Sequence, residues 1–186
     1  MSHDQTRIRF VPNADWNGTT TITFRAWDQS DGTANGSKIT SFPSNGTPPN
    51  DTSAYSSASA TAQLTVTPVN DPPVVDLNGS APGIDFATSF DPPGPQTIAI
   101  VDSNGLTVTD VDSPNLSGAT IILTNPQDGT NERLILNGQT GDFTVGNITV
   151  TYGTNGHSIT LSGLTTLANY QTLLRTLQYS NTRTFP

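Results

Sequence analysis

Asp110 and Asp112 are the side chains in this sequence that are best suited to chemistry. They alternate with uncharged residues in the segment Val108-Thr109-Asp110-Val111-Asp112-Ser113-Pro114. In a bent loop, alternating carboxylates can point at one cation, and Ca²⁺ prefers about six to eight oxygen ligands at roughly 2.3–2.6 Å. The pair could also be read as a general acid and base, but no neighbouring residues predict a pocket around it. A cation or simple solvation explains the pair better.

The rest of the sequence offers little for catalysis. There is no cysteine. There is also no Gly-x-Ser-x-Gly elbow, no glycine loop for phosphate and no histidine pair at zinc spacing. His157 is expected in a surface hairpin turn. We therefore expect a protein that is not an enzyme, although a glycoside-cleaving site built from two distant carboxylates stays open.

The composition predicts an all-β chain. Only 12% of the residues are charged, while the 16 glycines and 14 prolines favour short strands joined by turns over helices. Glu132 is the only glutamate among the 15 acidic residues, and aspartate is typical of turns and calcium loops. The seven Lys and Arg residues form no basic stripe, which argues against nucleic acid. No apolar run is long enough to span a membrane.

Alternating and β-branched stretches predict the strands of an antiparallel β-sandwich, separated by Asn-Gly and Asp-Gly turns. The predicted strands are Arg7–Val11, Thr19–Trp27, Ala60–Thr67, Thr97–Val101, Leu106–Thr109, Ala119–Thr124, Arg133–Leu136, Asn147–Tyr152, Ser158–Leu161 and Thr176–Tyr179.

Two segments depart from this pattern. Ser41–Ser59 is rich in Ser, Pro, Asn and Thr, which predicts a long loop without core residues, flanked on one side by a strand at Ser37–Ile39. Thr165–Thr176 has Leu167, Tyr170, Leu173 and Leu174 at helical spacing. A short helix near residues 165–175 should bury that stripe in the core.

A domain boundary is expected at Val66–Val75. This segment contains Pro68, Pro72 and Pro73, which fix φ and lack amide donors. The chain there should be extended and stiff, with the strands on either side belonging to different domains.

Asn70-Asp71-Pro72-Pro73 resembles the linker between bacterial cadherin-like repeats, and Asp110-Val111-Asp112-Ser113-Pro114 resembles the Asp-x-Asp-x-Pro element of the following repeat. The resemblance implies a calcium site at the junction of two repeats. Its ligands would be Asn70 and Asp71 from the linker, Asp110 and Asp112 from the second repeat, and an acid from the end of the first. Asp28 and Asp31 are the candidates for that last ligand, and Asn115 could add a carbonyl oxygen.

Phe10–Gly18 and Thr21–Asp28 are similar to the closing hairpin of such repeats. Residues 1–71 then correspond to the C-terminal part of one repeat, and residues 72–186 to the beginning, or the whole, of the next. Trp16 and Trp27 are expected as core anchors of the hairpin. Neighbouring copies could complete each other by strand addition and form a filament.

The resemblance implies an extracellular structural and adhesive segment of a bacterial surface protein, in which Ca²⁺ stiffens the junction. Its partners would be neighbouring repeats or copies, with glycans or other cell-surface components as further candidates. The alternative is a carbohydrate-binding sandwich that uses Trp16, Trp27 and the tyrosines. If the host glycosylates secreted proteins, acceptor asparagines are available at Asn17, Asn35, Asn45, Asn50, Asn78, Asn115 and Asn147.

Overall fold

The computed structural model describes residues 9–32, 54–56, 58–91 and 97–183, and the chain divides into two compact units, Met1–Val69 and Asn70–Pro186. The division falls inside the proline-rich segment that the sequence marks as an extended connection. Within the described residues the fold is mostly β, with several antiparallel sheets and one α-helix. The assignment of the two units to successive repeats stays a prediction.

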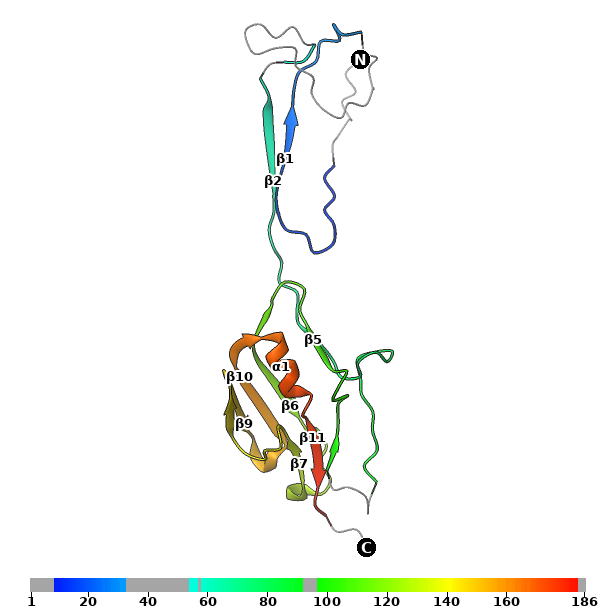
Figure 1. The fold of residues 1–186 in the computed structure, drawn as a ribbon, viewed down its shortest axis with the longest axis vertical. Helices are drawn as coiled ribbons and strands as arrows, with labels where there is room; N and C mark the ends of the chain where they lie inside the picture. Colours follow the sequence, from blue (N-terminus) through cyan, green and yellow to red (C-terminus); the bar gives the residue numbers. More distant parts are fainter. Residues whose placement is uncertain (1–8, 33–53, 57, 92–96, 184–186) are drawn as a thin grey trace. The chain divides into compact units, whose positions relative to one another are not determined.

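The first unit contains a two-stranded antiparallel ribbon of β1 (Gly18–Phe24) and β2 (Ala60–Val66), drawn in blue and cyan in Figure 1. Beyond the end of β1, Trp27 forms an isolated bridge with Tyr55. The two rings stack with their centroids 6.1 Å apart. Trp27 is half-buried and contacts an aromatic partner beyond the end of the ribbon, while its role as a core anchor stays a prediction.

Two expectations for the first unit need correction. Residues 9–11, the described part of the predicted strand Arg7–Val11, are not in a strand, because Phe10 instead packs edge-on against Trp16 with ring centroids 5.6 Å apart. Ala54 and Tyr55, inside the segment expected to lack core residues, are buried. Residues 33–53 lie outside the described part, and the predicted strand Ser37–Ile39 with them.

The second unit is built from three sheets. β6, β10, β9 and β8 form a four-stranded sheet in that order, β4, β11 and β7 form a three-stranded sheet, and β3 pairs with β5. Their bounds are β3 (Val74–Asp76), β4 (Thr97–Ala99), β5 (Thr107–Thr109), β6 (Asn115–Ile122), β7 (Glu132–Ile135), β8 (Phe143–Val145), β9 (Ile148–Tyr152), β10 (Ser158–Thr166) and β11 (Gln178–Asn181).

Helix α1 (Leu167–Leu174) begins directly after β10, where the Thr166 side chain accepts a hydrogen bond from the amide of Asn169 and caps the helix. The helix packs against β5, β6 and β10 (Figure 1). Tyr170, Leu173 and Leu174 are buried, so the predicted helix and its core-facing stripe are confirmed. No helix in the described ranges is long and apolar enough to cross a membrane.

The hydrophobic core of the second unit lies between the helix and the sheets. Alternate residues of each strand point into it, because side chains along a strand alternate between the two faces. The buried core residues are Val101, Leu106, Val108, Leu134, Leu136, Ile148, Val150, Ile159, Leu161, Tyr170, Leu173, Leu174 and Leu177.

Some strand bounds differ from the predicted ones, because pairing with a neighbouring strand extends a strand beyond its alternating sequence pattern. β6 begins at Asn115, four residues before the predicted start at Ala119, because its first residues pair with the far end of β10 across a register shift. β8 was not predicted, since a three-residue strand is too short to show alternation. Two single-turn 3₁₀ helices, Gly129–Asn131 and Thr154–Gly156, precede β7 and β10.

Candidate metal centre

The loop between β5 and β6 carries Asp110 and Asp112. Asp110 Oδ1 accepts hydrogen bonds from the amide of Asp112 at 3.1 Å and from the amide of Ser113 at 2.9 Å. Aspartate commonly bends a chain this way by replacing a backbone acceptor with its own carboxylate. The predicted bent loop is therefore present, and its turn is made by the first aspartate.

The pairing of β3 with β5 brings the start of the second unit to this loop. Because Val74 lies opposite Thr109 in an antiparallel register, the residues before Val74 run beside those after Thr109. The amide of Asp71 donates to Asp112 Oδ2 at 2.9 Å, and Asn70 Nδ2 donates to the carbonyl of Asp71 at 2.9 Å. Asn70, Asp71, Asp110 and Asp112 thus meet at one end of the second unit.

Asp110 and Asp112 belong to the same turn, in which the Asp112 amide donates to the Asp110 carboxylate. Burial acts to raise the pKa of Asp110, but hydrogen bonds from the Asp112 side chain and from the amides of Asp112 and Ser113 outweigh it and lower that pKa below its usual range. A Ca²⁺ ion beside this turn would be attracted by both carboxylates.

The described residues contain no group of three or more histidine or acidic side chains placed to hold a metal ion. Asp71 approaches Asp112 through its backbone amide, so the third carboxylate is near the pair without joining it. A cation here would take its protein ligands from the Asp110–Asp112 pair, and would need the Asp71 or Asn70 side chain to rotate toward it.

Asn115 and the two acids of the first unit are already engaged. The carbonyl of Asn115 accepts from Ser113 Oγ at 2.7 Å. Within the first unit, Asp28 Oδ1 accepts from the amide of Ser30 at 2.9 Å, and that bond is the main cause of a lowered Asp28 pKa. Asp31 Oδ1 accepts from the Trp27 indole at 3.2 Å. Whether Asp28 or Asp31 joins the calcium ligands stays a prediction.

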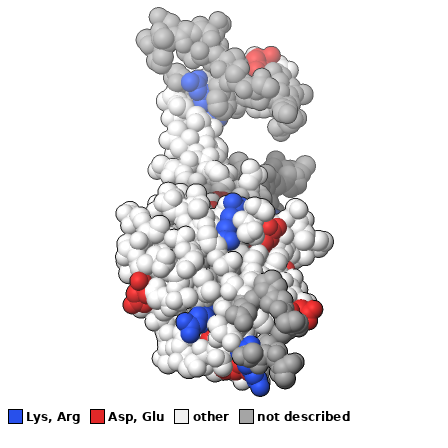
Figure 2. All heavy atoms as spheres, turned by 60° about the horizontal axis from the view of Figure 1, so that its bottom comes forward, with Lys and Arg blue, Asp and Glu red and all other residues white. Residues whose placement is uncertain are grey.

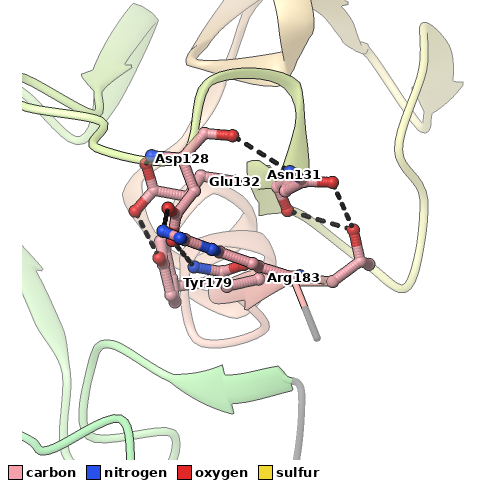
Figure 3. A network of polar contacts seen from close by, with 7 residues as sticks. Asp128, Asn131, Glu132, Tyr179 and Arg183 are labelled. Carbon is pink, nitrogen blue, oxygen red and sulfur yellow. Dashed lines mark hydrogen bonds and ion pairs between the residues drawn. The ribbon is translucent and has the colours of Figure 1, made fainter. Parts of the chain in front are cut away.

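A second polar cluster, which the sequence analysis missed, surrounds Glu132 (Figure 3). Glu132 is 7% exposed. Its Oε1 accepts from the Tyr179 hydroxyl at 2.6 Å and its Oε2 from the amide of Asp128 at 2.8 Å. Asp128 in turn accepts from Asn181 Nδ2 at 2.8 Å and forms an ion pair with Arg183. We call Asp128, Glu132, Tyr179, Asn181 and Arg183 the Glu132 cluster.

The Glu132 cluster is saturated with hydrogen bonds. Each of the four carboxylate oxygens of Asp128 and Glu132 accepts from a donor. Burial, followed by the bond to Glu132, raises the pKa of Tyr179 to about 12. The bonds from Asn181 and then Arg183 lower the pKa of Asp128. Such a network fixes β7 against β11.

His157 lies next to the Glu132 cluster. It was expected at the surface, yet it is half-buried, and its Nε2 lies 2.9 Å from the carbonyl of Gly129 and 3.1 Å from that of Glu132. Because both partners are acceptors, Nε2 must carry the proton. His157 therefore holds the turn before β10 against the turn before β7.

The surface of the second unit has few charges and no basic patch on the face in Figure 2, where acidic and basic residues appear as small scattered spots. A cavity of about 250 Å³ lies between α1 and the β8–β9 turn, and its lining contains no charged residue. The two tryptophans of the first unit are half-buried against other aromatic rings. Searches of protein-family models, curated proteins and solved structures found no match.

Proposed function

We propose that this chain is an extracellular structural and adhesive segment whose second unit binds Ca²⁺ at its amino-terminal end. The observation that supports the proposal is that the β3–β5 pairing brings Asp71 to the loop with Asp110 and Asp112, where its amide donates to Asp112 Oδ2 at 2.9 Å. A divalent cation would neutralise the charges of both loop carboxylates at once. Asn70 and Asp71 would supply further oxygens, so binding would couple the loop to the residues that lead into β3.

We also infer that the sheets of the second unit form a β-sandwich closed on one side by α1. The support is the single core to which the four-stranded sheet, the three-stranded sheet and the helix all contribute. A sandwich places loops at its two ends, and the loop with Asp110 is one of them. An ion there would act on the chain entry of the unit and leave its core unchanged.

Calcium titration of two matched double variants tests this function. Asp110→Asn with Asp112→Asn removes the charges but keeps the side-chain oxygen that accepts the amides of Asp112 and Ser113. The control, Asp85→Asn with Asp91→Asn, makes the same charge change at two exposed aspartates elsewhere in the unit. Calorimetry should detect Ca²⁺ binding to the parent chain and the control, and not to the first variant.

Thermal unfolding gives a second readout. At free Ca²⁺ about 100-fold above the dissociation constant, binding should stabilise the second unit by about 2.7 kcal/mol. Mg²⁺ should stabilise it less, because its smaller shell demands stricter geometry. Equal melting temperatures in Ca²⁺ and in EDTA would contradict the proposal.

A further inference from the structure

The ribbon of the first unit has one apolar and one polar face. Side chains alternate along both strands, and residues that lie opposite each other in the register share a face. The apolar face consists of Gly18, Thr20, Ile22, Phe24, Ala60, Ala62, Leu64 and Val66. The polar face consists of Thr19, Thr21, Thr23, Thr61, Gln63 and Thr65, and its Thr19 and Thr65 hydroxyls lie 3.4 Å apart.

Much of the apolar face is exposed. Phe24 is 44% exposed and Leu64 is 42% exposed. Trp16 covers one end, since its ring lies 3.5 Å from the position that a Cβ on Gly18 would take. At the other end, Phe24 and Ala60 are both exposed in the part of the chain that the structure describes. A two-stranded ribbon with an exposed apolar face is marginally stable in water, so a second layer would stabilise it.

The face also carries no charge. Neither β1 nor β2 contains a charged residue or a proline, although the chain has a net charge of −8. A partner must therefore bring an uncharged apolar surface of similar width.

We propose that the apolar face of the β1–β2 ribbon is a self-association surface, and that its partner is the same face of a second copy. Within one ribbon, a large residue of β1 is the cross-strand neighbour of a small residue of β2: Phe24 pairs with Ala60, and Ile22 pairs with Ala62. The face is therefore complementary in size to the same face of a second copy. A two-fold axis along the ribbon places Phe24 of one copy over Ala60 of the other. The result is a two-layer, four-stranded sandwich that closes on itself.

This pairing differs from strand addition, which would use the edges of the strands and grow into a filament. It also predicts a salt effect. The apolar surfaces attract at any ionic strength, while the net negative charge of each copy opposes association at low salt. Because a seven-residue ribbon offers a small face, the dimer should be weak and should strengthen when salt is added.

Sedimentation equilibrium from about 1 μM to 1 mM, in EDTA, tests the proposal. We expect a monomer–dimer equilibrium without larger species. Leu64→Asp should weaken association at least about tenfold, because it buries a charge in the interface. Gln63→Asp adds the same charge to the polar face one residue away and should leave the equilibrium unchanged. A chain that stays monomeric, grows beyond dimers, or responds equally to both variants would overturn the proposal.

Cross-linking keeps the test valid if Leu64→Asp unfolds the ribbon. The chain has no cysteine, so a single introduced thiol reports one position. Ala62→Cys on the apolar face should be joined between copies by a short bismaleimide cross-linker far more than Thr61→Cys on the polar face, because packed sheets lie about 10 Å apart. Equal yields from the two variants would show that the apolar face is not the contact.

Discussion

Asp128 illustrates how much a single residue contributes through its partners. It receives hydrogen bonds from Asn181, 53 residues away in sequence, and from Arg183, 55 residues away. Its amide donates to Glu132. The side chain is 11% exposed, so it is a shielded carboxylate with well-placed donors. Such donors favour the ionised form of the carboxylate over the protonated one, which makes the stability of the second unit depend on pH.

The variant Asp128→Asn should remove part of that pH dependence. The pKa of Asp128 is lowered in the folded chain from its ordinary value of 3.8, chiefly by Asn181 and then by Arg183. Its contribution to stability is therefore present above pH 3.8 and is lost as pH falls through the lower folded pKa. The melting temperatures of the second unit in the parent and the variant should differ at pH 7, and the difference should shrink as pH falls below 3.8. A difference that stays constant as pH falls would contradict this mechanism.

At the scale of the element, β10 contains a bulge that depends on one glycine. The register with β6 shifts between Ser162 and Thr165, and Gly163 within the shift has φ of +136°. A Cβ at Gly163 would lie 1.8 Å from the carbonyl oxygen of Asn147, inside any permitted contact. The carbonyl of Gly163 also accepts from the buried Tyr170 hydroxyl at 2.7 Å, so the bulge connects the strand to α1.

Gly163→Ala should therefore destabilise the second unit strongly. The neighbouring atom is backbone and cannot move aside, and the backbone conformation disfavours any Cβ, so we expect a loss of at least about 3 kcal/mol. Gly141→Ala is the control, because no atom lies within 4 Å of its Cβ position and its φ is not positive. Urea unfolding followed by far-ultraviolet circular dichroism should show a large shift for Gly163→Ala only. Similar midpoints for the two variants would mean that the bulge can relax.

The sequence predicted those elements whose signal is local. Helix α1 was recognisable from Tyr170 and Leu173 at helical spacing, and the bend at Asp110 from its aspartates and Pro114. The Glu132 cluster was not predictable, because it depends on β7 pairing with β11 across more than 40 residues. The one feature of the sequence that set this cluster apart was that Glu132 is the only glutamate in the chain. The burial of Tyr55 was missed for the same reason, since its partner Trp27 lies in a different segment.

At the scale of the whole molecule, the two units differ in how much apolar surface each buries. Among the described residues, the buried hydrophobic side chains of the first unit are Ala54 and Tyr55, whereas the second unit has a continuous core from Val101 to Leu177. Since burial of apolar surface provides most of the stability of a domain, the first unit should unfold more easily than the second. The loop with Asp110 belongs to the second unit, so Ca²⁺ should stabilise that unit alone.

Spectroscopy can separate the two transitions, because both tryptophans, Trp16 and Trp27, lie in the first unit. Tryptophan fluorescence should report unfolding at lower urea than the methyl NMR signals of Leu134 and Ile159 in the second core. Adding Ca²⁺ should move the methyl transition to higher urea and leave the fluorescence transition in place. A common midpoint for both probes would mean that the chain unfolds in one cooperative step. A shift of the fluorescence transition with Ca²⁺ would instead indicate that acids of the first unit, such as Asp28 or Asp31, contribute to the calcium site.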